Sequence, residues 1–349
     1  MRALFVGLAS FVFPGFGSGV VGRARAMAVW IAAVAVIGLA SAISVWFLPL
    51  FIVLRLASAI DGFRTMQVAG RSGARLQWIE GLIAIGATIA IQLALRFLVV
   101  EAYRIPSSAM VPTFAVGDHI LAEKLSLHWG TPAHGDVIVF RQPCEPDRDY
   151  IKRVIALPGE TIEIRCNVVY VGGAALAWRL VEGDSCTYDD YDEANEKWYP
   201  RQCSEYSETN DGHTYHVYHD PDRPMRDERE RTGAPLRADR KDFPLVDGAR
   251  VPPSCASDGS FGARGDVRTS NQQTGSIVET KPAAGPCERQ LHYVVPAGHV
   301  FVLGDSRANS NDSRYWGAVP IENIRGRAIG IWWGGGKSGM SLQRFGAID

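Results

Sequence analysis

A run of residues without any ionisable side chain, from Ala26 to Leu54, constrains this chain more than any other feature. Together with residues 55–59, it is longer than the roughly 20 residues that one helix needs to cross a bilayer. The sequence therefore predicts a helical hairpin over residues 26–59, and one long tilted helix is the alternative. Pro49 is expected to kink the returning helix. The turn is expected at Ser41, Ser44 and Trp46.

Two further apolar segments flank the hairpin. Residues 78–100 are interrupted only by Glu80, Gln92 and Arg96, and they have the length of one membrane span. Residues 4–21 contain a proline and several glycines, which suits a re-entrant or interfacial segment. A cleaved signal peptide is the alternative for this segment. It is disfavoured because arginines follow the apolar stretch, where a cleavage site of small residues is expected.

The arginines predict how the spans are oriented. Residues 1–100 contain only ten charged side chains, and eight of them are arginines. Three of these, Arg64, Arg71 and Arg75, lie between the hairpin and the last span. Positively charged loops stay in the cytoplasm, so this loop is expected there. Everything after Val100 then lies on the other side of the membrane.

Charge is distributed unevenly after the last span. Residues 173–290 contain 37 charged side chains, whereas the whole chain has a net charge of −1. The balance gives no reason to expect a nucleic-acid partner. We divide the chain into a membrane domain, residues 1–100, a β domain formed by residues 101–173 and 291–349, and a large polar insertion, residues 174–290.

The exported part has the composition of a mostly antiparallel β domain. Segments rich in valine, isoleucine and aromatic residues alternate with turns that contain glycine or proline. The insertion is expected to have few regular elements, and its charge run, residues 223–231, is expected to be a solvated surface. Partner binding and shielding of a cleft are alternatives for the insertion. The expected strands are 119–125, 136–140, 150–156, 161–171 and 299–303.

The cysteines support an exported domain. All six follow the last span, and an even number outside the membrane domain suits disulfides in an oxidising compartment. Six cysteines allow 15 pairings, and the sequence does not select one. Free thiols or a metal site are the alternatives. The six are Cys144, Cys166, Cys186, Cys203, Cys255 and Cys287.

Three histidines recur at every third position, His213, His216 and His219. Such a spacing raises the question of a metal site. The surrounding segment is rich in tyrosine and strand-like, and on a strand these positions do not share one face. No metal and no other cofactor are therefore expected.

Three motifs carry the chemistry of the exported part. They are Tyr103 to Asp118, Asp149 to Glu160 and Gly304 to Gly317. In this order, after a membrane anchor, they resemble the bacterial type I signal peptidases, membrane-bound serine proteases that cut signal peptides from exported proteins. The resemblance covers roughly residues 100–175 and 290–346. The third motif, Gly-Asp-x-Arg-x-Asn-Ser-x-Asp-Ser-Arg, is the most specific.

The first motif departs from the family at its reactive position. The family pattern is Pro-Ser-x-Ser-Met-x-Pro-Thr, in which the second serine is the nucleophile, and this chain has Ala109 there. The resemblance thus implies that the chain as written lacks peptidase activity. We interpret Ala109 as an engineered replacement of that serine. A natural pseudo-enzyme and the use of Ser107 or Ser108 as nucleophile are the alternatives.

Lys152 matches the general base of the family. A lysine accepts a proton near neutral pH only if burial in apolar surroundings lowers its pKa. The neighbouring residues Ile151, Val154 and Ile155 can supply such surroundings. A surface lysine on a strand is the structural alternative, and the presence of all three motifs disfavours it.

The resemblance also implies roles for other positions. The Ser107 hydroxyl and the backbone N–H of residue 109 would form the oxyanion hole. Ser310 would orient the lysine, and Asp312 and Arg314 would form a supporting salt bridge. The residues Asp305, Arg307 and Asn309 are expected to shape the loop rather than to act chemically.

The implied substrate is a preprotein whose signal peptide ends in Ala-x-Ala. Shallow apolar pockets would accept alanine and exclude larger side chains. The residues expected to line these pockets, or to rest on the bilayer, are Ile105, Met110, Val111 and Phe114. The lipid bilayer and the protein-export machinery are the other expected partners.

The resemblance places the protein in the bacterial inner membrane as a multi-pass protein, with its catalytic domain on the periplasmic side. A non-catalytic protein that binds signal peptides or the export machinery is the main alternative function. A self-cleaving Ser/Lys regulator is a third, and the membrane spans and the absence of a DNA-binding segment disfavour it.

Overall fold

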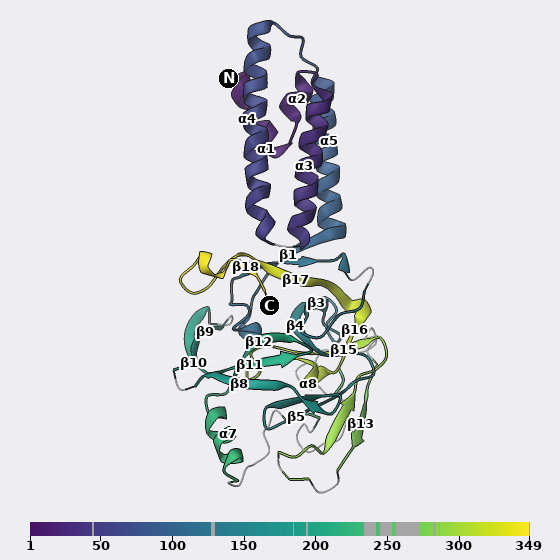
Figure 1. Ribbon diagram of the computed structural model, residues 1–349, viewed down its shortest axis with the longest axis vertical. Helices are drawn as coiled ribbons and strands as arrows, with labels where there is room; N and C mark the ends of the chain where they lie inside the picture. The colour runs from purple at the N-terminus through teal and green to yellow at the C-terminus, as the bar shows by residue number, and fades with distance from the viewer. Residues whose placement is uncertain are drawn as a thin grey trace. The chain divides into compact units, whose positions relative to one another are not determined.

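The computed structural model describes residues 1–43, 45–126, 130–183, 185–192, 195–233, 242–244, 253–255, 273–281, 284–285 and 287–348. The chain divides into two compact units (Figure 1). We call the first the helical unit; it comprises Met1–Ala102, Leu121–Leu125 and Ile329–Trp332. We call the second the β unit; it comprises Tyr103–Ile120, Ser126–Ala328 and Trp333–Asp349.

The helical unit contains two long helices where the charge-free run was found. Helix α3 ends at Ile43, and α4 begins at Leu48 and packs against α3, so the chain forms two helices rather than one long helix. Ser44 lies outside the described residues. The expected kink at Pro49 is wrong. Pro49 lies in the first turn of α4, where a missing N–H leaves no hydrogen bond unmade. The helices are α1 (Arg2–Val12), α2 (Phe16–Val20), α3 (Ala24–Ile43), α4 (Leu48–Ser72) and α5 (Trp78–Ala94), with a 3₁₀ turn at Val45–Phe47 and a π turn at Leu95–Val99.

Small residues let the first two helices pack closely on α4. A Cβ atom on Gly17 would lie 2.4 Å from the Cα of Gly62, and one on Gly62 would lie 2.2 Å from the Ser10 Oγ. Glycine at both positions therefore allows the backbones to approach. The one acidic residue of α4, Asp61, accepts hydrogen bonds from the Ser18 hydroxyl at 2.9 Å and from the Trp30 indole at 3.1 Å.

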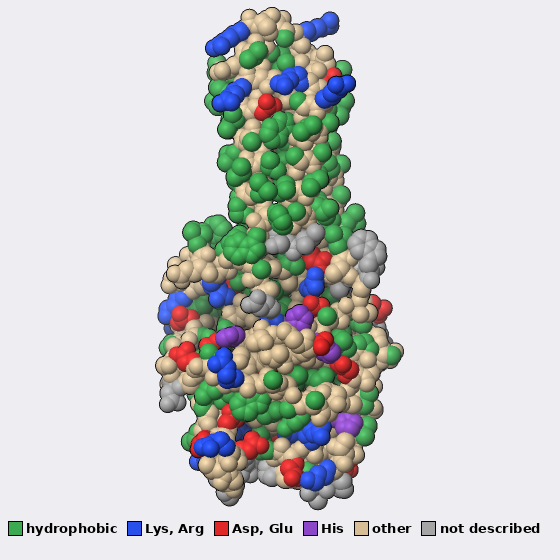
Figure 2. Space-filling view, viewed as in Figure 1, with side chains coloured by type: hydrophobic (Ala, Val, Ile, Leu, Met, Phe, Trp, Pro, Cys, Tyr) green, Lys and Arg blue, Asp and Glu red, His purple; other side chains and the backbone are tan. Residues whose placement is uncertain are grey.

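The surface of the helical unit is strongly apolar. Many large hydrophobic side chains of α3, α4 and α5 are exposed, and Figure 2 shows hydrophobic side chains covering the middle of the unit while basic side chains, all arginines in residues 1–100, gather at one end. Among the described residues, one helix is long and apolar enough to cross a membrane, over Ala24–Ser41. Helices α1 and α5 are apolar but shorter.

The described strand pairings confirm a mostly antiparallel β domain. The largest sheet has the order β1-β2-β17-β3-β4-β15-β16, with β18 paired to β17. Its strands are β1 (Val100–Arg104), β2 (His119–Glu123), β3 (Val137–Arg141), β4 (Asp149–Ala156), β15 (His299–Leu303), β16 (Val319–Pro320), β17 (Ile324–Trp333) and β18 (Gly346–Ala347). A second sheet has the order β13-β14-β5-β6-β7, with β5 (Thr161–Arg165), β6 (Val168–Val171), β7 (Ala174–Ala175), β13 (Ser276–Glu279) and β14 (Leu291–Val294).

The expected strand 161–171 is two strands. Cys166 and Asn167 have positive φ angles of 46° and 67°, so the chain reverses there and β5 pairs with β6 as a tight hairpin. The sequence analysis missed this turn because the residues on both sides of it have strand character. The main core of the β unit lies beside this hairpin and includes Ile162, Phe243, Tyr293 and Phe301, all fully buried.

The expectation of few regular elements in the insertion is wrong. Its described residues form two further sheets, β10-β9 and β12-β11-β8, and helix α7. The charge run 223–231 is this helix, and its first residue, Arg223, is buried with its guanidinium 3.8 Å from the centre of the Tyr206 ring. The elements are β8 (Ala177–Glu182), β9 (Thr187–Asp192), β10 (Lys197–Gln202), β11 (Ser204–Asn210), β12 (His213–His219) and α7 (Arg223–Arg231).

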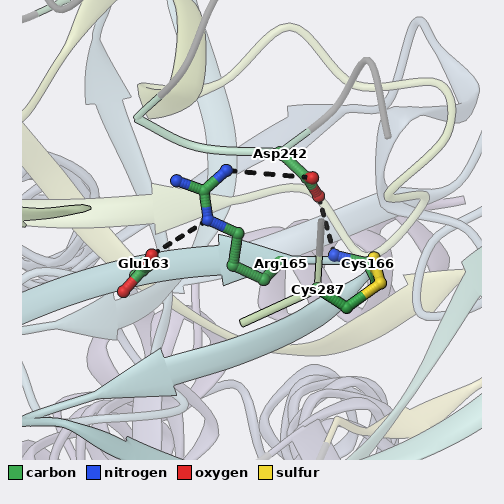
Figure 3. The surroundings of a disulfide bond; sticks show 5 residues. All are labelled: Glu163, Arg165, Cys166, Asp242 and Cys287. Atoms are coloured by element: carbon green, nitrogen blue, oxygen red, sulfur yellow. Dashed lines mark hydrogen bonds and ion pairs between the residues drawn. A yellow bond between two sulfur atoms is a disulfide. The ribbon is translucent and has the colours of Figure 1, made fainter. Parts of the chain in front are cut away.

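All six cysteines form disulfides, which confirms that expectation. The pairs are Cys144–Cys255, Cys166–Cys287 and Cys186–Cys203. Buried charges surround the second pair (Figure 3). Arg165 donates to Glu163 at 2.9 Å and faces Asp242 at 3.9 Å, while Asp242 accepts from the Cys166 backbone at 2.7 Å. These contacts hold the described residues around Asp242 against β5.

Candidate active site

Lys152 lies on β4, between β3 and β15 in the largest sheet. Only 4% of the residue is exposed. Burial lowers the pKa of Lys152 to about 8; the nearby Asp312 and Asp305 carboxylates oppose this shift, and Arg314 adds to it. Its ammonium donates to the Ile151 carbonyl at 2.8 Å. Lys152 is therefore a buried lysine with a lowered pKa and not a surface lysine on a strand.

Strand pairing brings the second and third motifs together. Leu303, the last residue of β15, pairs with Arg153 of β4. The chain then enters the loop of the third motif, residues 304–314, which begins next to Lys152. Two motifs about 150 residues apart thus meet because β4 and β15 are neighbours.

A buried ion pair closes the loop of the third motif. Asp312 caps helix α8 (Ser313–Trp316) and accepts from Arg314 Nε at 2.8 Å and from the Gly304 backbone at 3.1 Å. Burial alone would raise the pKa of Asp312, but Arg314 and the hydrogen bonds hold that pKa below its usual value. The buried Ser310 hydroxyl lies beside this carboxylate and also lowers the pKa of Asp312.

The first motif forms a 3₁₀ turn over Ser108–Met110 that packs against this loop. The Ala109 carbonyl accepts from the Ser306 backbone at 3.2 Å. A Cβ on Gly304 would lie 2.5 Å from that carbonyl and 2.2 Å from the Ser310 Oγ. Only glycine fits between them, so Gly304 brings position 109 and Ser310 into the same small region.

The turn exposes alternate residues. Ser107 is exposed, Ser108 is 2% exposed and Ala109 is half-buried. The Ser108 hydroxyl points inward and bonds to Asp190, whereas Ser107 and position 109 remain accessible. Positions 107 and 109 can therefore be reached from outside, whereas Ser108 cannot.

Arg153 is a site residue that the sequence analysis missed. Its guanidinium forms a fully buried pair with Asp305 at 2.9 Å and donates to the Thr113 hydroxyl at 3.2 Å. Thr113 in turn donates to Asp305 at 2.5 Å. One residue of each motif thus meets in one buried cluster. Long-range pairing of this kind leaves no local sequence pattern.

The insertion also reaches the site. The backbone of Tyr218 on β12 donates to the Asp305 carbonyl at 2.8 Å and accepts from the Arg307 backbone at 2.8 Å. The Arg307 side chain forms a buried pair with Glu208 of β11. Strands β11 and β12 of the insertion therefore hold the loop of the third motif through hydrogen bonds and an ion pair. Arg307 takes part in both kinds of contact.

The four residues expected to line substrate pockets are all nearly inaccessible. Their exposed fractions are 2% for Ile105, 1% for Met110, 5% for Val111 and 0% for Phe114. Such burial is incompatible with resting on a bilayer. In this structure these side chains pack behind the turn.

The described residues contain no group of three or more His, Cys, Asp or Glu side chains arranged to hold a metal ion. Of the three spaced histidines, His216 bonds to Glu205 at 2.5 Å at the surface and His219 is 3% exposed.

The geometry and the comparisons with known proteins define the class. The candidate site combines a buried lysine of lowered pKa, a partly accessible turn and a buried polar loop, and residues 75–333 match the family described as Signal peptidase, peptidase S26. The chain belongs to this family of signal peptidases.

Its relatives include signal peptidase I proteins. Signal peptidase I of Aquifex aeolicus (strain VF5) is 33% identical over 266 residues, covering 75% of this chain and 85% of the relative. Signal peptidase I of Pseudomonas aeruginosa is 30% identical over 265 residues, covering 69% of this chain and 68% of the relative. A solved signal peptidase I from Enterococcus faecalis V583 is 20% identical, covers 56% of this chain and 96% of its own, and has a TM-score of 0.23, which is too low to support an argument.

Proposed function

We propose that this chain is the scaffold of a type I signal peptidase that removes signal peptides after Ala-x-Ala sites, held inactive because Ala109 replaces the nucleophilic serine. One observation carries the proposal. Lys152 is buried, has a pKa of about 8, and lies on the strand next to the loop that packs against position 109. A lysine with these properties can act as a base at neutral pH.

The reaction follows from these positions once residue 109 is a serine. Neutral Lys152 takes the proton from the serine hydroxyl as its oxygen attacks the scissile carbonyl. The Ser107 hydroxyl and the residue 109 N–H donate to the oxyanion. Collapse expels the amine of the mature protein, which receives the proton from Lys152. A water molecule deprotonated by Lys152 then hydrolyses the ester.

Ser310, Asp312 and Arg314 support this lysine in the proposal. The Ser310 hydroxyl, which lies beside the Asp312 carboxylate, would orient Lys152, while Asp312 and Arg314 fix the loop that carries Ser310. The buried apolar residues Met110 and Phe114 would shape the floor of the pocket for the alanine side chains.

Ser108 is a poor candidate for the nucleophile. Its hydroxyl is buried and is held by the Asp190 carboxylate and the Asn309 amide, so a substrate carbonyl cannot approach it in this structure. Hydrogen bonds hold the pKa of Asp190 below its usual value although burial would raise it, which makes it a weak base. An inactive form therefore fits the structure better than a displaced nucleophile.

We further propose a multi-pass protein of the bacterial inner membrane, with the β unit in the periplasm. Two features support this placement: Arg64 and Arg71 in the last part of α4 with Arg75 after it, and the disulfides of the β unit. The proposed partners are preprotein signal peptides, the lipid bilayer and the protein-export machinery.

Cleavage of a preprotein with an Ala-x-Ala site tests the activity. The comparison uses the chain as it is, Ala109→Ser, and Ala109→Ser with Lys152→Ala, each in detergent or liposomes. Cleavage by Ala109→Ser, but not by the chain as it is or by the double variant, supports the proposal. A natural Ala109 favours the second candidate, a pseudo-peptidase that binds signal peptides. Inactivity of Ala109→Ser together with tight signal-peptide binding by both forms would establish that candidate instead.

A further inference from the structure

A carboxylate from the insertion lies beside position 109. Asp190 is on β9 and is only 5% exposed. It accepts a hydrogen bond from the hydroxyl of Ser108, which is 82 residues earlier in the chain. The Asn309 amide donates to the Asp190 carboxylate at 3.1 Å and to the Ser108 hydroxyl at 2.9 Å. Asp190, Ser108 and Asn309 therefore form a closed triangle of hydrogen bonds, which we call the clamp.

The clamp joins the two loops on which the proposed reaction depends. Ser108 is adjacent to both Ser107 and Ala109, and Asn309 is adjacent to Ser310. The two clamp partners of Asp190 are thus each one position away from a residue of the proposed machinery. A small shift at either contact would move the oxyanion donors or the serine that orients the lysine.

The carboxylate is itself held firmly. The Tyr199 hydroxyl and Arg201 of β10 each donate to Asp190 at 2.9 Å, and the Tyr191 backbone donates at 2.9 Å. With so many donors Asp190 stays ionised at neutral pH, because they hold its pKa below the usual value.

The hairpin that carries Asp190 is anchored at its base. Strands β9 and β10 pair from Thr187 with Gln202 to Asp192 with Lys197. The Cys186–Cys203 disulfide lies directly outside the first of these pairs. The insertion thus offers a rigid support for a contact with the site.

Besides the clamp, backbone contacts hold the turn: the Ser306 N–H donates to the Ala109 carbonyl at 3.2 Å. Its 3₁₀ hydrogen bond runs from the Val111 N–H to the Ser108 carbonyl at 3.2 Å, and no side chain caps it. Oxyanion donors contribute most when their direction is fixed before the substrate binds. A buried serine tied to a fixed carboxylate provides that direction.

We propose that Asp190 is a positioning residue of the proposed peptidase site, which holds Ser108 and Asn309 so that the residue 109 N–H, Ser107 and Ser310 keep their reactive arrangement. The inference rests on the proposed function for its catalytic meaning. The clamp itself is a set of hydrogen bonds, and it can be tested in a chain that has no peptidase activity.

Hydrogen–deuterium exchange of the chain as it is tests the clamp without any reaction. Asp190→Asn and, separately, Ser108→Ala should speed exchange of the amides of residues 107–111 by roughly tenfold. Ser108→Ala breaks the clamp without altering the hairpin, so it covers the case in which Asp190→Asn misfolds. Asp189→Asn is the matched control, because Asp189 is a half-exposed neighbour that pairs with Lys337. Unchanged exchange in both clamp variants would overturn the proposal.

Kinetics in the Ala109→Ser form separate positioning from simple stability. Asp190→Asn should lower kcat by roughly 10- to 100-fold and change KM by less than about threefold. Adding Ser108→Ala should cost little more, because both changes break one unit. A kcat within about twofold of the parent in both single variants would contradict positioning. Cleavage by the chain with Ala109 that is lost in Ser108→Ala would also contradict positioning. Inactivity of Ala109→Ser would instead count against the proposed function, while the exchange measurement still decides the clamp.

Discussion

The Arg153 guanidinium and the Asp305 carboxylate form an ion pair of 2.9 Å in which neither side chain is more than 1% exposed. Arg153 is next to Lys152 on β4, and Asp305 opens the loop that ends at Arg314. The pair therefore fixes the lysine strand to the loop. Such a pair costs desolvation, and removal of one partner leaves an uncompensated buried charge.

Arg153→Met is expected to destabilise the β unit by about 3–5 kcal/mol, because Asp305 is left buried and unpaired. Adding Asp305→Asn should recover part of this loss. Denaturant unfolding followed by tryptophan fluorescence measures both effects. The control is Arg148→Met, whose side chain is 59% exposed in an i,i+3 pair and should change stability by less than about 1 kcal/mol. Equal effects at the two arginines would contradict the account.

Gly304→Ala tests the close contact between the loop and the turn. The added Cβ would lie 2.5 Å from the Ala109 carbonyl and 2.2 Å from the Ser310 Oγ, so one of them must move. We expect a loss of about 1–3 kcal/mol in stability and, in the Ala109→Ser form, of at least roughly 100-fold in kcat/KM. Gly183→Ala is the control, because its new Cβ would meet only Pro224 at 3.9 Å. Full activity in Gly304→Ala would show that the contact does not set the site.

Lys152→Met should stabilise the chain at pH 7. The folded state lowers the pKa of Lys152 from 10.5 to about 8, so the folded protein binds this proton less well than the unfolded chain. The resulting cost is fully present below pH 8 and disappears as the pH rises to about 10.5. We expect a gain on the order of 2–3 kcal/mol at pH 7 and a much smaller gain at pH 10.5. Lys197→Met, at an exposed position, should show no such pH dependence in unfolding experiments.

Cysteine labelling in spheroplasts tests the proposed orientation. Ala74 follows α4 and is exposed, and Thr214 is exposed on β12. A membrane-impermeant maleimide should label Thr214→Cys in intact spheroplasts and Ala74→Cys only after lysis. The reverse pattern would place the β unit in the cytoplasm.

Local patterns predicted some of the strands and missed others, among them β14, β16 and β17. The segments 119–125, 150–156 and 299–303 correspond closely to β2, β4 and β15, because each is rich in aliphatic or aromatic residues and lies near turn residues. The hairpin at Cys166 and Asn167 was missed, because the residues on both sides have strand character and Asn167 is the only turn residue between them. The insertion was misread because charged composition was taken as irregular structure. In fact its strands are paired even where their residues are exposed to solvent. The buried Arg223 guanidinium packs on an aromatic ring.

The site was predictable only as far as motifs extend. Lys152, Ser310, Asp312 and Arg314 lie in local patterns, and the structure gathers the last three in one loop near the lysine. The contacts of Arg153 and Asp190 could not be predicted. Their partners lie on strands or loops distant in sequence, and only the fold brings them together.

The pH dependence of cleavage by Ala109→Ser tests the central claim most directly. Lys152 must be neutral to accept the serine proton, so kcat/KM should rise with pH and reach half its maximum near pH 8, the pKa of the buried lysine. Lys152→Ala in the same form should abolish the activity. Cleavage that is independent of pH from 6 to 9, cleavage that survives Lys152→Ala, or no cleavage at any pH would contradict the account.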